Sequence, residues 1–258
     1  MQKAIEGFVR LGYFAKAVVY LLIATLALQL AIGARGGRIT DQGGALAVVL
    51  RQPMGSMLVL FLAIGLLTYA GWQIAAAILG WRRHARESAL SRTLTIVRAA
   101  VYGAIGVQAM RLAIGLRAGH SGPAPLVREA LHWPFGKWMV LAAGLGIAWY
   151  GIVEIRDAIK GRLESDLDAP DLRRAAGAWA LDVARIGIIA RAVLMVVLAT
   201  GVVRAALVQR ASAAGGMDAS LLILNSLPSG RLVLGATAAG LFAYGIYQLL
   251  HARFARFS

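Results

Sequence analysis

The sequence predicts an all-α integral membrane protein in which six transmembrane helices form three parallel hairpin repeats around a pseudo-threefold axis. Three observations support this prediction. Apolar residues make up 59% of the 258 residues, charged residues make up only 15%, and the mean hydropathy is +0.70. Soluble domains carry about 25% charged residues, so the deficit indicates contact with lipid. In addition, six apolar stretches are long enough to cross a bilayer, and one residue pattern recurs three times.

The six apolar stretches are the expected membrane spans, and they lie at roughly 11–33, 54–80, 93–116, 135–158, 184–210 and 229–252. A helix needs about 20 residues to cross a bilayer core about 30 Å thick. Helices are expected because lipid offers no partner to unpaired backbone groups. The first stretch has some features of a signal peptide, but it contains Lys16 and Gln29 and its pattern recurs later in the chain. We therefore expect it to be the first span.

The recurring pattern covers both helices of each hairpin. Each first helix carries two basic residues six positions apart. A third position of the pattern follows four residues after the second basic residue, and a fourth position follows nine residues after the third. These sets are Arg10, Lys16, Tyr20 and Gln29; Arg92, Arg98, Tyr102 and Arg111; and Arg185, Arg191, Met195 and Arg204. Each second helix opens with Pro-x-Gly, which is followed at fixed spacing by glycine, tyrosine, and glutamine or glutamate. These sets are Pro53, Gly55, Gly65, Tyr69 and Gln73; Pro134, Gly136, Gly146, Tyr150 and Glu154; and Pro228, Gly230, Gly240, Tyr244 and Gln248.

These offsets predict a single membrane domain over residues 1–258, with repeats at 6–82, 88–160 and 181–254. Proline is expected in the first turn of each second helix, where its missing N–H is tolerated. A polar linker over 160–182 joins the second and third repeats, and a short interfacial helix is expected within it. Its acidic cluster lacks the glycine and closing glutamate of a calcium loop, so capping and a solvated turn are favoured over a metal site.

With these motifs the chain resembles the bacterial membrane proteins that carry the domain of unknown function numbered 1206. The resemblance extends over nearly the whole chain and implies three tandem two-helix repeats. The first repeat fits best, from Gly7-Phe8-Val9-Arg10-Leu11-Gly12-Tyr13 onward. The second has Leu94 where the others have a glycine two residues after the first arginine, and the third has Met195 in place of tyrosine. The resemblance implies a fold and no established activity.

The basic residues predict orientation and partners. The chain holds 27 Lys and Arg against 12 Asp and Glu, giving a formal charge of +15. The two termini and the connections between spans two and three and between spans four and five, with the adjoining helix ends, carry 17 of these 27 basic residues. The connections on the opposite side of the membrane carry 10. Both termini are therefore expected in the cytoplasm, with the protein in the inner membrane. Anionic lipids are the expected partners, no nucleic-acid motif is present, and no protein partner is indicated.

The candidate ligand-binding residues form a polar layer toward the cytoplasmic ends of the helices. Ionisable residues within membrane spans usually mark function. They are Lys16, Tyr20, Tyr69, Gln73, Arg98, Tyr102, Tyr150, Glu154, Arg191, Tyr244 and Gln248. Residues four apart share a helix face, and the glycine on each second helix is expected to let a neighbouring helix approach. Glu154 must pair or protonate in lipid, and Arg98 of the same repeat is the expected partner.

Two interpretations of this layer stay open. It could bind or pass a small anion, a solute or an anionic lipid head, or it could only pack helices and contact partners. The outer Gln29, Arg111 and Arg204 could extend to the far interface or line a second polar layer. The chain has no cysteine, and its four histidines lack the i, i+4 spacing of a helical metal site. No cofactor, metal or nucleophile motif is present, so no enzymatic activity is expected.

Overall fold

The computed structural model describes residues 2–79, 89–116, 123–160 and 179–254, and all the regular elements in these ranges are helices joined by turns and short loops. Six long helices correspond to the six apolar stretches. They are α1 (Gln2–Ala31), α3 (Gly55–Leu79), α4 (Ala89–Ala113), α6 (Gly136–Ile159), α8 (Trp179–Val208) and α10 (Gly230–Phe254). The expected linker helix within 160–182 falls on residues outside the described ranges, apart from the start of α8.

Five of the long helices are long and apolar enough to cross a membrane. They supply the stretches Arg10–Ala31, Gly55–Ala75, Gly136–Ile159, Trp179–Val208 and Gly230–Arg253. Helix α4 is not among the five, although its 25 residues equal the length of α3 and α10. The chain is thus an all-helical membrane protein with five candidate spans in its described part.

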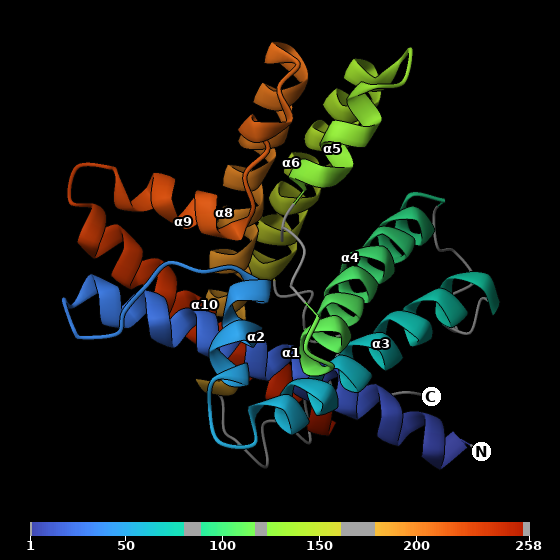
Figure 1. Ribbon diagram of the computed structural model, residues 1–258, viewed down its shortest axis with the longest axis vertical. Helices are drawn as coiled ribbons and strands as arrows, with labels where there is room; N and C mark the ends of the chain where they lie inside the picture. The colour runs from blue at the N-terminus through green and yellow to red at the C-terminus, as the bar shows by residue number, and fades with distance from the viewer. Residues whose placement is uncertain (1, 80–88, 117–122, 161–178, 255–258) are drawn as a thin grey trace.

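Neighbouring long helices pair mainly between repeats. Helix α1 packs along α10, α3 along α4, and α6 along α8, and these three pairs spread from a shared centre (Figure 1). Helix α1 also packs on α3, and α8 on α10, so the first and third hairpins are closed. Among the described residues, α4 and α6 make no comparable contact, and Figure 1 shows them apart, in different helix pairs.

Each repeat also contains a short helix before the Pro-x-Gly motif, which the sequence analysis did not predict. These helices are α2 (Gln42–Leu50), α5 (Ala124–Leu131) and α9 (Met217–Asn225), and each packs against the long helix that follows it. A 3₁₀ turn, η2 (Ala211–Ala213), precedes α9. Asp41 caps α2 by accepting a hydrogen bond of 2.8 Å from the Gly44 backbone N–H.

The Pro-x-Gly motif makes the tight turn between each short helix and the next long one. The long helices begin at Gly55, Gly136 and Gly230, so the prolines lie just before the first helical turn rather than within it. A Cβ added at Gly136 would lie 1.8 Å from the carbonyl oxygen of Ala130. Glycine is therefore required because the long helix starts directly against the end of the short one.

Candidate functional site

The ammonium group of Lys16 lies among three tyrosine rings at the centre of the helices. Its Nζ is 4.7 Å from the ring centroid of Tyr102, 5.3 Å from that of Tyr69 and 5.5 Å from that of Tyr244. These rings come from α4, α3 and α10, one from each repeat. Lys16 is 6% exposed. Aromatic faces attract a cation, and the attraction grows when water is excluded. The tyrosines therefore stabilise a charge that burial disfavours.

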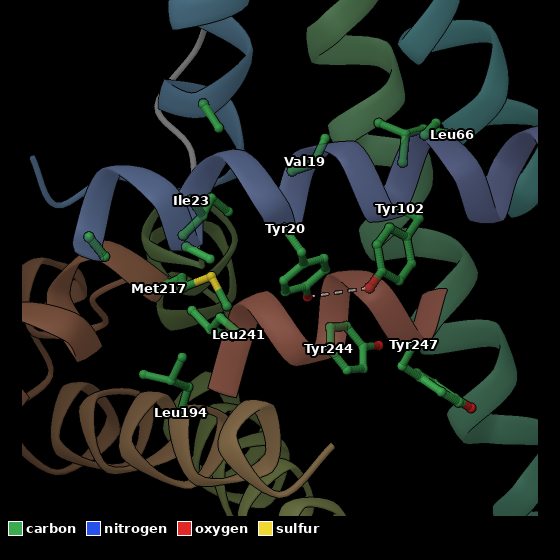
Figure 2. Close-up of a cluster of buried hydrophobic side chains, with 14 of the residues drawn as sticks. Val19, Tyr20, Ile23, Leu66, Tyr102, Leu194, Met217, Leu241, Tyr244 and Tyr247 are labelled. Atoms are coloured by element: carbon green, nitrogen blue, oxygen red, sulfur yellow. Dashed lines mark hydrogen bonds between the residues drawn. The ribbon is translucent and has the colours of Figure 1, made fainter. Parts of the chain in front are cut away.

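The tyrosines also contact one another (Figure 2). The hydroxyl oxygens of Tyr20 and Tyr102 are 3.5 Å apart, and the figure draws this contact between α1 and α4. Tyr20 meets Tyr244 edge to face at 4.8 Å, and Tyr69 meets Tyr102 in the same manner at 5.1 Å. Edge-to-face geometry places the positive rim of one ring on the negative face of the next. Together these contacts join α1, α3, α4 and α10.

The buried ion pair of the site joins α6 to α8. Arg191 donates through Nη1 to both carboxylate oxygens of Glu154, at 2.7 and 2.5 Å. The hydroxyl of Tyr150 donates to the same carboxylate at 3.1 Å. The Arg191 guanidinium also lies 5.3 Å from the ring centroid of Tyr244, which connects the pair to the tyrosines around Lys16. Such a pair is tolerated in a low dielectric only when its geometry and hydrogen bonds are good.

The partner of Glu154 differs from the one that the sequence predicted. Arg98 of the same repeat was expected, whereas the structure pairs Glu154 with Arg191 of the third repeat. The reason is that α6 packs along α8, so the two side chains face each other across that contact. Arg98 lies in α4, and its side chain is outside the described part of the chain.

Three buried polar atoms of the site have no hydrogen-bond partner among the described residues. They are Oε1 of Gln73, Oε1 of Gln248 and Nε of Arg191. The amide nitrogen of Gln73 donates to the Tyr69 hydroxyl at 2.8 Å, so only its oxygen is left. An unpaired buried polar atom costs about 1–3 kcal/mol, and most such atoms in proteins are paired with protein groups or ordered water. These three atoms therefore mark where a further polar group would be stabilised.

Nine of the eleven predicted site residues are linked by the contacts described above. They are Lys16, Tyr20, Tyr69, Gln73, Tyr102, Tyr150, Glu154, Arg191 and Tyr244. We call this set the polar cluster. Gln248 is 2% exposed and lies one turn beyond Tyr244 on α10, whereas Arg98 cannot be placed beyond its helix.

The sequence analysis missed three aromatic residues that extend the cluster. Tyr13 meets Tyr69 at 5.1 Å and His251 at 4.3 Å between ring centroids, and Tyr247 lies between His251 and Tyr244. Tyr13 has no tyrosine at the equivalent positions of the other repeats, so the repeat pattern gave no signal for it. The spacing of Tyr244, Tyr247 and His251 on one helix face was a signal that could have been used.

The equivalent glycines on the second helices of the three repeats differ in burial and in how closely a neighbouring helix approaches them. A Cβ at Gly65 would lie 2.8 Å from the Cβ of Ala15, and one at Gly240 would lie 2.2 Å from the Cβ of Ala190. Both glycines are buried at close helix contacts, as expected. Gly146 is exposed, so the expectation of a close helix approach is wrong for the second repeat.

Two further features bear on ligands. The part of the chain that the structure describes contains no group of three or more metal-ligating side chains that could hold an ion. A groove of about 400 Å³ lies where the start of α1 meets the end of α10. Arg10 and Arg253 line it together with the apolar side chains of Leu11, Phe14 and Leu249.

Apolar helices of spanning length around a buried polar cluster define the class as a helical membrane protein. The sequence model of the Domain of Unknown Function (DUF1206) family matches three times, at residues 11–80, 95–161 and 186–255, and the chain belongs to this family. It is similar to the "Uncharacterized protein YxxB" of Bacillus subtilis (strain 168), with 32% identity over 248 residues that cover 95% of this chain and 90% of the relative. No solved structure matches it.

Proposed function

We propose that the chain crosses the bacterial inner membrane six times, with α4 as the sixth span and three parallel hairpins around a pseudo-threefold axis. A helix of 25 residues is about 37 Å long, which exceeds a core of about 30 Å. Helix α4 packs along α3, as α1 packs along α10 and α8 along α6. The distribution of Lys and Arg favours cytoplasmic termini.

Single cysteines test this topology directly, because the chain has none of its own. Cysteines replacing Ala34, His132 and Ser212 should react with a membrane-impermeant maleimide added outside spheroplasts. Cysteines replacing His84 and Ser258 should react only after the membrane is opened. If the cysteine that replaces His132 reacts only after the membrane is opened, α4 does not span the membrane and the six-span proposal is wrong.

Within this fold, we propose that the polar cluster binds an anionic group, carried by a small anion, another solute or a lipid head. The observation that carries the proposal is Nε of Arg191, a buried donor with no partner among the described residues, on a side chain that is 4% exposed. Glu154 uses only Nη1 of the guanidinium. The edge that contains Nε is therefore free to donate to a phosphate or carboxylate, the anions whose geometry a guanidinium fits.

Replacing Arg191 by lysine tests this binding, because lysine keeps the positive charge but lacks Nε. Hydrogen bonds to charged groups contribute about 1.5–3 kcal/mol, so affinity for the anion should fall by at least about tenfold. The probes are phosphatidylglycerol, followed by native mass spectrometry, and inorganic phosphate, followed by thermal shift. Arg210→Lys, at an exposed site, is the matched control. Equal affinity of R191K and the wild type for both probes would overturn the proposal.

Two specific observations favour the alternative, a structural or partner-binding module without a ligand. Arg191 is paired with Glu154, and Lys16 lies among three tyrosine rings, so two cations of the cluster already contact protein groups. Under this alternative, Arg191 and Glu154 variants lose stability, but the wild-type protein retains no phosphatidylglycerol in native mass spectra and inorganic phosphate does not shift its melting. We propose no catalytic role under either reading.

Anionic lipids are the partners that we propose for the protein surface as well. The groove between α1 and α10 combines two guanidinium groups with apolar walls, which suits a phosphate head with its first acyl carbons. Basic pockets between helix ends on the cytoplasmic side are typical sites for such heads.

A further inference from the structure

We propose that the anionic group bound at Arg191 belongs to a ligand that also carries a hydroxyl group, which donates a hydrogen bond to Oε1 of Gln248. The shared chemistry is that of a phosphoglycerol group, whether it comes from the head of a phospholipid or from a soluble ester. This inference rests on the proposed anion binding at the polar cluster and adds a second contact to it. It follows from the hydrogen-bonding capacity that the buried residues around Tyr244 leave unused.

Two buried atoms of opposite hydrogen-bonding character, on neighbouring helices, have no partner within the described part of the chain. Nε of Arg191 on α8 is a donor, and Oε1 of Gln248 on α10 is an acceptor. The two side chains are buried, with Arg191 4% and Gln248 2% exposed. An anion alone would pair with Nε and leave Oε1 unpaired, because an anionic oxygen cannot donate. A ligand that satisfies both atoms therefore needs an anionic oxygen and a donor.

Helices α8 and α10 pack closely and run antiparallel. A Cβ added at Gly187 would overlap the backbone of Tyr244, and one added at Gly240 would overlap Ala190. The contacts thus advance along α8 as they go back along α10. The two glycines allow the backbones to approach this closely. Side chains of one helix are therefore within reach of side chains of the other.

The side chains of Arg191 and Gln248 lean toward one of these contacts from opposite sides. Arg191 lies one turn after Gly187 on α8, and Gln248 lies one turn after Tyr244 on α10. Side chains on a helix tilt toward its N-terminus. On antiparallel helices, both side chains therefore tilt toward the level where Gly187 meets Tyr244. The Arg191 guanidinium reaches this level, because it is 5.3 Å from the Tyr244 ring centroid.

The surrounding charges favour a hydroxyl over an ammonium group as the donor. Nζ of Lys16 is 5.5 Å from the Tyr244 ring centroid, and the Arg191 guanidinium approaches the same ring. Both would repel a further cation, and such repulsion is strong where water is excluded. A hydroxyl carries no charge and still donates to an amide oxygen. Arg191 and Gln248 each lean in from about 6 Å along their helices, so the hydroxyl and the anion are joined by a short chain, as in phosphoglycerol.

Gln73 provides an internal comparison for Gln248. It occupies the equivalent position in the first repeat and is 1% exposed, and its Oε1 likewise has no partner among the described residues. Its helix, α3, packs on α1 and α4, and in the described ranges it makes no comparable contact with α8. Gln73 is therefore not placed to share a ligand with Arg191.

The test compares ligands that differ in the hydroxyl group. Phosphatidylglycerol and phosphatidylmethanol have the same phosphodiester charge, and only the head of phosphatidylglycerol carries hydroxyl groups. Glycerol 3-phosphate and methyl phosphate form the matched soluble pair. Native mass spectrometry follows the lipids, and thermal shift follows the soluble esters. The wild type should prefer the hydroxylated member about threefold to tenfold, the contribution of one hydrogen bond. The pair that shows this preference identifies the source of the ligand.

Variants assign the preference to a residue. Gln248→Met removes the acceptor oxygen and keeps a flexible side chain of similar length, so the preference should disappear while binding of phosphatidylmethanol and methyl phosphate is unchanged. Gln73→Met deletes an equally buried oxygen away from α8, and it should leave the preference intact. The ligand comparison on the wild type needs no variant, so it decides the proposal even if Q248M fails to fold.

The outcomes separate this inference from the anion binding on which it rests. Equal binding of both members of each pair by the wild type overturns the hydroxyl contact, and anion binding stands if R191K weakens all the ligands. A preference that survives in Q248M, or that Q73M removes as well, overturns the assignment to Gln248. If the wild type binds none of the probes, the anion binding and this inference both fail. Loss of every ligand in R191K, with loss of the preference alone in Q248M, supports both.

Discussion

Arg191 on α8 and Glu154 on α6 form the ion pair that ties the second repeat to the third, through one guanidinium nitrogen and both carboxylate oxygens. This single contact lies between two helices that pack along each other and beside the tyrosines that surround Lys16. Its geometry leaves Nε of Arg191 without a hydrogen-bond partner among the described residues.

Breaking the pair from either side should destabilise the protein. Glu154→Gln or Arg191→Gln leaves the remaining charge buried without its partner, which costs about 3 kcal/mol. The double variant E154Q/R191Q should recover part of this loss, because no charge is then left over. Melting in detergent measures the effect. The exposed pair of Arg185 and Asp182 is the control, and Asp182→Asn should cost less than about 1 kcal/mol. Unchanged midpoints for both single variants would contradict the role of the pair.

The rings around Lys16 should matter more than their hydroxyl groups. Tyr102→Phe keeps the ring 4.7 Å from Nζ and loses only the long contact with Tyr20, so a cost of about 0.5–1.5 kcal/mol is expected. Tyr102→Leu removes the ring and should cost at least about 1 kcal/mol more, through the lost cation–π and edge-to-face contacts. Comparison of the two midpoints in the same detergent is the measurement. A phenylalanine variant as unstable as the leucine variant would assign the stabilisation to the hydroxyl instead.

The three equivalent glycines should respond differently to alanine. Gly65→Ala and Gly240→Ala place a methyl group against Ala15 or Ala190 and should each destabilise by about 1–3 kcal/mol. Gly146→Ala adds its methyl to an exposed helix face and should be neutral or slightly stabilising, because alanine favours helix by up to about 1 kcal/mol. The three melting midpoints form an internally controlled set. A destabilising effect of G146A equal to that of G65A would show that the second hairpin is closed in the membrane.

The groove between α1 and α10 should select anionic lipid through its two arginines. Each basic residue near the surface contributes about 1 kcal/mol, so Arg10→Gln and Arg253→Gln should each lower the preference for phosphatidylglycerol over phosphatidylcholine about fivefold. The ratio of the two lipids retained in native mass spectra measures this preference. Arg35→Gln and Arg210→Gln, exposed elsewhere, serve as controls. A fall of the same size in the controls would indicate a general charge effect and no groove site.

The apolar stretches predicted the six long helices. The repeat offsets predicted most of the polar cluster, because residues four apart on a helix share a face. The offsets carried no information on which helices are neighbours. The predicted partner of Glu154 was therefore wrong. Long helices pack mainly against helices of other repeats, and Arg191 of the third repeat faces Glu154. Tyr13 was missed because it has no counterpart in the other repeats.

The exposed position of Gly146 was not predicted, because all three repeats have glycine at this offset. The tight contacts at Gly12 and Gly187, where a Cβ does not fit, were not predicted either. Only coordinates supply such a distance.

The most direct test of the anion-binding proposal is a high-resolution density map of the wild-type protein in nanodiscs that contain phosphatidylglycerol. The account predicts density for an anionic group within hydrogen-bond distance of Nε of Arg191, while Nη1 stays on Glu154. A map in which Nε donates to another side chain of the protein, with no further density at the pair, would contradict it and favour a purely structural cluster.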